Sequence, residues 1–181
     1  MIYPSTGSDD RSGVGIMQIV LVEDFTPDNF KPYGHILDAG DARPRLNFCV
    51  DFLNERADAR LNLALIQAPK ITLPFIYDVL ERHPYSEQIF LPLSTTTSLI
   101  VVAQSNHENQ PDLTTLKAFI IPPGLGITYR TDTWHTGMVA LEGSSHFAML
   151  IHEAGTRDDC HYQAVSKFEV QTKSDIHFKS D

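Results

Sequence analysis

Residues 81–93, ERHPYSEQIFLPL, bring basic, acidic and amide side chains to the start of an apolar run. His83 is suited to proton transfer, because an imidazole has an ordinary pKa near neutrality. Pro84 drives the preceding residue toward an extended conformation, so the ring has a defined direction at the start of a strand. Glu87 and Gln88 follow, and because strand side chains alternate between two faces, one of them must point inward. An exposed loop histidine is the alternative interpretation of the same spacing.

Residues 131–137, TDTWHTG, form a second candidate site, in which the single tryptophan stands beside a histidine. Trp134 suits either the core or a flat platform for a ligand. His135 suits either proton transfer or a hydrogen bond to a backbone carbonyl. The spacing leaves these alternatives open, because only the fold can bring His135 beside His83.

The spacing of the eight histidines does not support a dedicated metal site. Barrels that hold a metal commonly present His-x-His, an acid and a distant His, and this chain contains no His-x-His. His146 and His152 would share one face of a strand, but the strand rise places them about 20 Å apart, too far for one ion. No metal or other cofactor is therefore expected, although the histidines do not exclude a divalent cation. The other four histidines are expected to be solvated: His35, His107, His161 and His177.

Length and charge indicate one soluble domain whose partner is a small molecule. The chain has 181 residues, and 14 Lys and Arg against 23 Asp and Glu give a net charge of -9. A phosphate-binding surface normally needs a basic stripe, so nucleic acid is not an expected partner. No apolar run reaches the length of a membrane span and no basic leader opens the chain, so we expect a cytoplasmic protein without membrane contact. Cys49 and Cys160 lie far apart without a CxxC pattern and are expected to be reduced thiols.

Short apolar segments bounded by Pro, Gly, Asn or Asp recur along the chain, which is typical of a β-sandwich or β-barrel. A barrel of this size can hold a small-molecule pocket in its mouth. We expect a disordered or extended tail over residues 1–15, a barrel domain over 16–165, and a polar, lightly docked tail over 166–181. The expected strands cover residues 17–22, 46–53, 60–68, 88–93, 98–105, 117–122, 126–130, 137–141 and 146–153.

Helical signals are few and short. Thr26 matches an N-cap, before a helix of one or two turns that ends near Gly34. Residues 73–84 combine helical spacing of apolar positions with side chains that favour strands, so they are left open between the two. Residues 111–119 are expected to begin with a single turn capped by Asp112.

Four blocks in one colinear order carry a resemblance to a known family: LERHPYSEQIFLPL, IVVAQ, PDLTTLKAFIIPPGLGITYRTDTWH and MVAL. They resemble the ureidoglycolate lyase family, formerly called ureidoglycolate hydrolases. The resemblance runs from about residue 17 to about residue 161 and is strongest from 80 to 141. It implies an all-β, cupin-like barrel with a few short helical turns, which is usually a homodimer. It also implies cleavage of (S)-ureidoglycolate to glyoxylate and urea in purine and allantoin degradation.

The reaction implied by this resemblance needs two proton transfers. Breaking the C–N bond of a carbinolamine takes a proton from the hydroxyl and gives one to the departing urea nitrogen. The resemblance places His83 and His135 in these roles, and Gln88 in a hydrogen bond to the ureido or carboxylate group. Lys117 is the candidate electrostatic partner. It is preferred to Arg82, which alternation puts on the face opposite His83, toward solvent or a dimer contact.

The resemblance implies three further candidate substrate-binding residues: Gln67, Tyr129 and Trp134. Gln67 stands where the family typically has Arg, and Gln does not replace a bidentate guanidinium without changing the anion that is bound. Thr136 follows His135 where the family usually has a second histidine. These departures keep open a family member that acts as a lyase, isomerase or cyclase on another small substrate, and a barrel that binds without catalysis.

Overall fold

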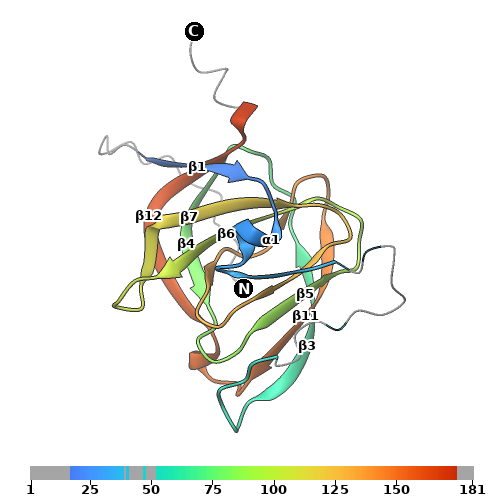
Figure 1. The fold of residues 1–181 in the computed structure, drawn as a ribbon, viewed down its shortest axis with the longest axis vertical. Helices are drawn as coiled ribbons and strands as arrows, with labels where there is room; N and C mark the ends of the chain where they lie inside the picture. Colours follow the sequence, from blue (N-terminus) through green and yellow to red (C-terminus); the bar gives the residue numbers. More distant parts are fainter. Residues whose placement is uncertain (1–16, 39, 41–46, 48–51, 175–181) are drawn as a thin grey trace.

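The computed structural model describes residues 17–38, 40, 47 and 52–174, which fold into two β-sheets (Figure 1). The all-β barrel expected from the sequence is confirmed. The seven-stranded sheet has the order β10 (Val139–Ala140), β6 (Ser98–Ser105), β7 (Pro111–Ile121), β1 (Gln18–Glu23), β12 (His161–Gln171), β4 (Phe75–Arg82) and β9 (Trp134–His135). The five-stranded sheet has the order β2 (Gly34–Leu37), β8 (Gly126–Tyr129), β5 (Gln88–Pro92), β11 (Ser145–Glu153) and β3 (Arg60–Ala68).

The first sheet closes into a ring of strands, because β9 pairs with both β4 and β6. The ring runs β6-β7-β1-β12-β4-β9 and returns to β6. Its interior is apolar and packed, which is the usual content of a small barrel. Every strand of the ring contributes to this inner core, for example Val20, Leu80, Val101, Ala118, Trp134 and Phe168.

A second core lies between the ring and the five-stranded sheet. Val102 and Phe119 of the ring belong to the same buried cluster as Phe90, Tyr129 and Ile151 of the second sheet. Alternation explains the two cores, because β6 sends successive side chains to opposite faces and both faces are covered. The polar side chains of the candidate site converge in this layer between the sheets.

β4 is the segment that the sequence left open between helix and strand. It pairs antiparallel with β12, and its Glu81 pairs with His135 of β9. Tyr77 and Leu80 are buried in the inner core. The strand prevails because aromatic and β-branched residues pack well on a sheet that has partners on both sides.

The expected short helix is confirmed as α1 (Pro27–Phe30), although its end differs. Thr26 is the N-cap, and its Oγ1 accepts a hydrogen bond of 3.2 Å from the Asn29 amide. Gly34 does not stop the helix but begins β2. Glycine is required there because a Cβ would lie 1.7 Å from the carbonyl oxygen of Thr128 on the paired strand β8.

Two expected boundaries differ from the structure. Residues 111–119 contain no capped turn before a strand, because β7 begins at Pro111; Asp112 instead accepts a hydrogen bond from the Thr114 amide inside the strand. The polar tail does not begin at residue 166, because β12 continues to Gln171. Its later residues Phe168 and Val170 are fully buried, so the alternate polar residues of this strand are its outer face.

Some expectations lie outside the described residues. These are the tail over 1–15, most of the strand expected at 46–53 with Cys49, His177, and the last part of the C-terminal tail. In the part of the chain that the structure describes, no helix is long and apolar enough to cross a bilayer.

Candidate active site

Two acid–base side chains reach the same layer from the end of β4. Glu81 and His83 are separated by one residue, so alternation places both on the face that looks toward the five-stranded sheet. Both are buried, with 3% and 8% exposed surface. Arg82, between them, points the other way: its guanidinium lies 5.0 Å from the centre of the Trp134 ring and donates to Asp132 at 2.7 Å. Arg82 is therefore apart from the site, as expected, but it is buried rather than turned to solvent.

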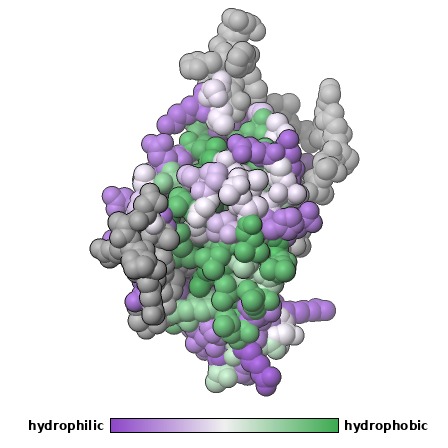
Figure 2. All heavy atoms as spheres, turned by 90° about the vertical axis from the view of Figure 1, so that its right-hand side faces the viewer, coloured by the Kyte–Doolittle hydropathy of each residue, from purple (hydrophilic) through white to green (hydrophobic). Residues whose placement is uncertain are grey.

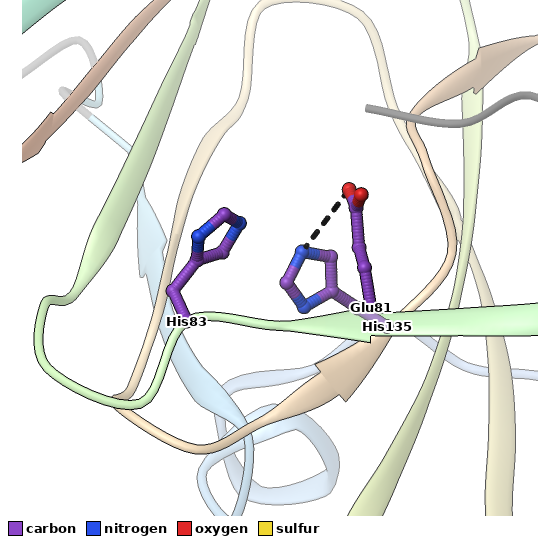
Figure 3. A group of neighbouring side chains, drawn as sticks. All are labelled: Glu81, His83 and His135. Carbon is purple, nitrogen blue, oxygen red and sulfur yellow. Dashed lines mark ion pairs between the residues drawn. The ribbon is translucent and has the colours of Figure 1, made fainter. Parts of the chain in front are cut away.

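His135 joins this pair through strand pairing. Its strand β9 lies beside β4, with His135 directly opposite Glu81. The Nε2 atom of His135 lies 3.7 Å from Oε1 of Glu81, and the His83 and His135 rings are 5.5 Å apart, centre to centre. Figure 3 shows the three side chains turned toward one another. The two histidines named from the sequence therefore belong to one site, and Glu81 is its third member.

A cavity of about 780 Å³ opens beside this group. Glu81 and His83 line it directly, while His135 lies behind Glu81 and is only 1% exposed. The cavity is large enough for a small molecule. The exposed turn Gly155–Arg157 forms part of its wall. The other described lining residues are Ile66, Gln88, Met149, Glu153, Asp159, Cys160, His161 and Tyr162.

The backbone sets the tautomer of both histidines. His83 Nδ1 lies 2.8 Å from the Asp159 carbonyl oxygen, and His135 Nδ1 lies 2.8 Å from that of Thr133. A carbonyl oxygen only accepts, so each ring carries its hydrogen on Nδ1 when neutral. The Nε2 lone pair of His83 is then left as the basic atom of that ring, and the Nε2 lone pair of His135 faces Glu81.

Burial keeps both rings uncharged. Desolvation lowers the pKa of His83 to about 4, although the hydrogen bond to Asp159 opposes the shift. Desolvation, followed by repulsion from His83, lowers the pKa of His135 to about 3. Both imidazoles are therefore neutral near pH 7, and His83, which lines the cavity, is able to accept a proton from a bound molecule.

The same three residues have ligand atoms suited to a divalent cation. Atoms of Glu81, His83 and His135 all lie within 4.8 Å of one another, and two imidazoles with one carboxylate are a common ligand set. The spacing in the sequence did not reveal this group, because it arises from an i, i+2 pair on one strand and a third residue on the neighbouring strand.

The chain is similar in sequence to a known protein family and to several of its members. The model of the family described as Ureidoglycolate lyase matches residues 17–173. The chain belongs to the ureidoglycolate lyase family. A "Putative ureidoglycolate lyase" of Agrobacterium fabrum is 32% identical over 144 residues, covering 79% of this chain and 88% of the relative. A "Ureidoglycolate lyase" of Chelativorans sp. is 27% identical over 148 residues, covering 77% and 87%. One of Saccharomyces cerevisiae is 35% identical over 99 residues, covering 52% and 51%.

In this ureidoglycolate lyase family member, Gln88 meets the expectation of an inward-facing residue. It is 2% exposed, lines the cavity, and directs its Nε2 to the Met149 sulfur at 3.1 Å. Tyr129 does not line the cavity; its ring stacks on that of His135, with centres 4.1 Å apart. Trp134 lies in the inner core of the ring, which is the structural alternative considered from the sequence.

Two other expected binding residues lie away from the cavity of this family member. Lys117 binds Glu23 at 2.9 Å on β7 and β1, where both side chains are partly exposed. Gln67 is exposed on β3, while its neighbour Ile66 lines the cavity, because alternation turns Gln67 to the outer face. Neither residue is placed to contact a molecule beside His83.

Sequence reasoning missed Glu81 and the turn at residues 154–160. The role of Glu81 could have been predicted, because a residue two positions before His83 on a strand points to the same face. No sequence pattern indicated Asp159: its carboxylate accepts from the amides of Ala154 and Thr156 and pairs with Arg56, while its carbonyl holds His83. These contacts join loops that are distant in the sequence.

Proposed function

We propose that the protein is a ureidoglycolate lyase that cleaves (S)-ureidoglycolate to glyoxylate and urea by general acid–base catalysis. The observation that carries this proposal is the convergence of Glu81, His83 and His135 beside a cavity of about 780 Å³. The family membership supports the choice of substrate.

His83 is the general base in this proposal. Its Nε2 has a lone pair, since Nδ1 donates to Asp159, and burial keeps the ring neutral. It takes the hydroxyl proton of the carbinolamine, the C–O bond becomes the carbonyl of glyoxylate, and the C–N bond breaks toward urea. The positive charge that forms on the ring is stabilised by the Asp159 carbonyl oxygen.

Glu81 and His135 together supply the proton for the departing nitrogen. Oε1 of Glu81 and Nε2 of His135 are both acceptors when the acid is ionised and the ring is neutral, yet they lie 3.7 Å apart in a buried site. One proton held by this pair removes the conflict and provides a general acid. After urea leaves, transfer of the proton from His83 back to the pair restores the starting state.

Gln88 completes the inner wall of the substrate site. Its Nε2 is directed to Met149, which leaves its buried Oε1 to accept a hydrogen bond from a ureido N–H group. The acidic groups of Glu81, Glu153 and Asp159 offer contacts to a polar substrate. The family membership favours ureidoglycolate over the alternative of another small substrate.

The decisive experiment incubates the purified protein with racemic ureidoglycolate and measures glyoxylate, urea and ammonia. A lyase releases glyoxylate and urea in equal amounts and no ammonia, and it consumes half of the racemate. Release of ammonia in place of urea, or a rate equal to spontaneous decay, contradicts the proposal.

We further propose that the protein is a cytoplasmic homodimer of purine catabolism. The free thiol of Cys160 is consistent with a reducing compartment. The outer face of the five-stranded sheet supports the dimer: β3, β5 and β11 carry an uncharged apolar surface, green in Figure 2. A second copy is a suitable occupant, because uncharged faces avoid the repulsion expected between chains of net charge -9. The exposed large apolar residues of this face are Leu61, Leu63, Leu65, Leu91 and Leu93.

A further inference from the structure

The substrate of the proposed reaction carries a carboxylate, and the cavity described above is rich in acids. Glu81, Glu153 and Asp159 all line it. An anionic substrate needs a cation or several donors in such a surrounding. Gln67, which the sequence offered as a candidate for binding the substrate, lies on the outer face of β3 and does not line the cavity.

We propose that Arg157 binds the substrate carboxylate at the rim of the cavity. Among the described residues that line the cavity, Arg157 is the one with a permanent positive charge. No carboxylate of the described residues lies within ion-pair distance of its guanidinium. This assignment rests on the proposed function and adds the residue that selects an acid over its neutral analogues.

The other arginines near the cavity are engaged elsewhere. Arg56 pairs with the Asp159 carboxylate and lies 4.8 Å from the centre of the Tyr85 ring. Arg82 pairs with Asp132 on the opposite face of β4. Arg157 is exposed and therefore remains available to a bidentate ligand such as a carboxylate.

The turn that carries Arg157 is fixed to the catalytic base. Arg157 begins the short 3-10 helix η1 (Arg157–Asp159) between β11 and β12. The Asp159 carboxylate accepts from the Ala154 amide at 2.9 Å and the Thr156 amide at 2.8 Å, and the Asp159 carbonyl binds His83 at 2.8 Å. The same hydrogen-bonded turn therefore carries Arg157 and orients the His83 ring.

This arrangement defines how ureidoglycolate lies in the cavity. Its carboxylate is at the exposed rim with Arg157, its carbinol carbon is beside buried His83, and its ureido group reaches buried Gln88. Part of the binding free energy at the rim then serves to hold the reacting carbon against the base.

The test compares Arg157→Gln and Arg157→Lys with Arg60→Gln, a matched control that removes an exposed arginine outside the cavity lining. We expect Arg157→Gln to raise KM for ureidoglycolate about 10- to 100-fold while kcat changes less than about threefold. Arg157→Lys is expected to recover part of the loss, because it keeps the charge but not the bidentate geometry. Arg60→Gln is expected to leave both constants unchanged.

A binding measurement separates this inference from the proposed reaction. The probes are oxalurate, a stable analogue with a carbonyl in place of the carbinol carbon, and the amide of oxalurate, which lacks the negative charge. Wild type is expected to prefer oxalurate to its amide at least tenfold, and Arg157→Gln to lose that preference. An unchanged preference or an unchanged KM overturns the role of Arg157, even if wild type cleaves ureidoglycolate. If wild type does not cleave ureidoglycolate, the proposed function fails, and the two probes still decide whether Arg157 selects an acid.

Discussion

Glu81 and His135 face each other across two neighbouring strands, with Oε1 of the glutamate 3.7 Å from Nε2 of the histidine and both side chains almost completely buried. Their contact depends on the antiparallel pairing of β4 and β9, in which these two residues are directly opposite. A buried acid beside a neutral imidazole can hold a proton for transfer to a leaving group.

Replacing Glu81 with Gln keeps the shape of this side chain but removes its capacity to transfer a proton. We expect kcat for ureidoglycolate cleavage to fall about 10²- to 10⁴-fold, the usual contribution of a general acid or base. Steady-state release of glyoxylate measures the effect. Glu142→Gln, at an exposed position, is the control and should retain wild-type activity. Activity of Glu81→Gln within threefold of wild type would remove Glu81 from the mechanism.

His83 makes stability depend on pH in a defined window. Burial lowers its pKa in the folded protein to about 4, below the ordinary value of 6.5, so the unfolded chain binds the proton first as pH falls. Above pH 6.5 the ring is neutral in both the folded and the unfolded chain. As pH falls from 6.5 toward 4, only the unfolded chain takes up the proton, so the free energy of unfolding decreases. The destabilisation caused by His83→Gln should therefore shrink between pH 6.5 and pH 4.5, by up to about 1.4 kcal/mol per unit. Urea unfolding of both proteins at each pH tests this, and a difference that is independent of pH would contradict it.

Lys117 lies outside the cavity, so its replacement should not affect the reaction. Its ammonium group pairs with Glu23, and both side chains are about one-third exposed, so the pair is screened by solvent. Lys117→Met should change the free energy of unfolding by less than about 1 kcal/mol and leave kcat and KM unchanged. A marked rise in KM would restore Lys117 to the substrate site that the sequence suggested.

Gly34 has a steric requirement that Gly143 lacks. A Cβ at position 34 would lie 1.7 Å from the Thr128 carbonyl oxygen, whereas one at 143 would have no heavy atom within 4 Å. Gly34→Ala should lower the free energy of unfolding by about 2–4 kcal/mol, since the paired strands β2 and β8 must separate. Gly143→Ala is the matched control, with an expected effect within about 0.5 kcal/mol. Equal melting temperatures for the two variants would show that this close approach is not required.

The proposed dimer face can be tested by placing a charge on it. Leu63 is 64% exposed on β3, and Leu63→Arg should convert the dimer to a monomer, because an unpaired guanidinium would be buried at the contact. Ile19→Arg, at an exposed apolar residue of β1, is the control for added charge alone and should stay dimeric. Analytical ultracentrifugation gives the mass of each. A monomeric wild type contradicts the dimer, and a dimeric Leu63→Arg places the contact on another face.

The sequence alone predicted many of the strands, although not β2 or β12, and the faces of particular residues. The apolar segments at 98–105 and 146–153 are strands with the bounds expected or close to them, and Thr26 caps a short helix as its residue type indicates. Gln88 points inward and Arg82 is turned away from His83, as the period of two requires. These features are local, because backbone geometry and side-chain alternation decide them within a few residues.

Tertiary structure alone decided which of these faces meet. Ring closure through β9 brought His135 to Glu81, and the same pairing sent Trp134 into the inner core. Lys117 pairs with Glu23 of β1 and does not line the cavity. Arg157 lines the cavity from a turn that the pattern of apolar residues did not indicate. The physical reason is that alternation specifies the face of a residue, whereas strand order and register between distant segments specify what lies opposite that face.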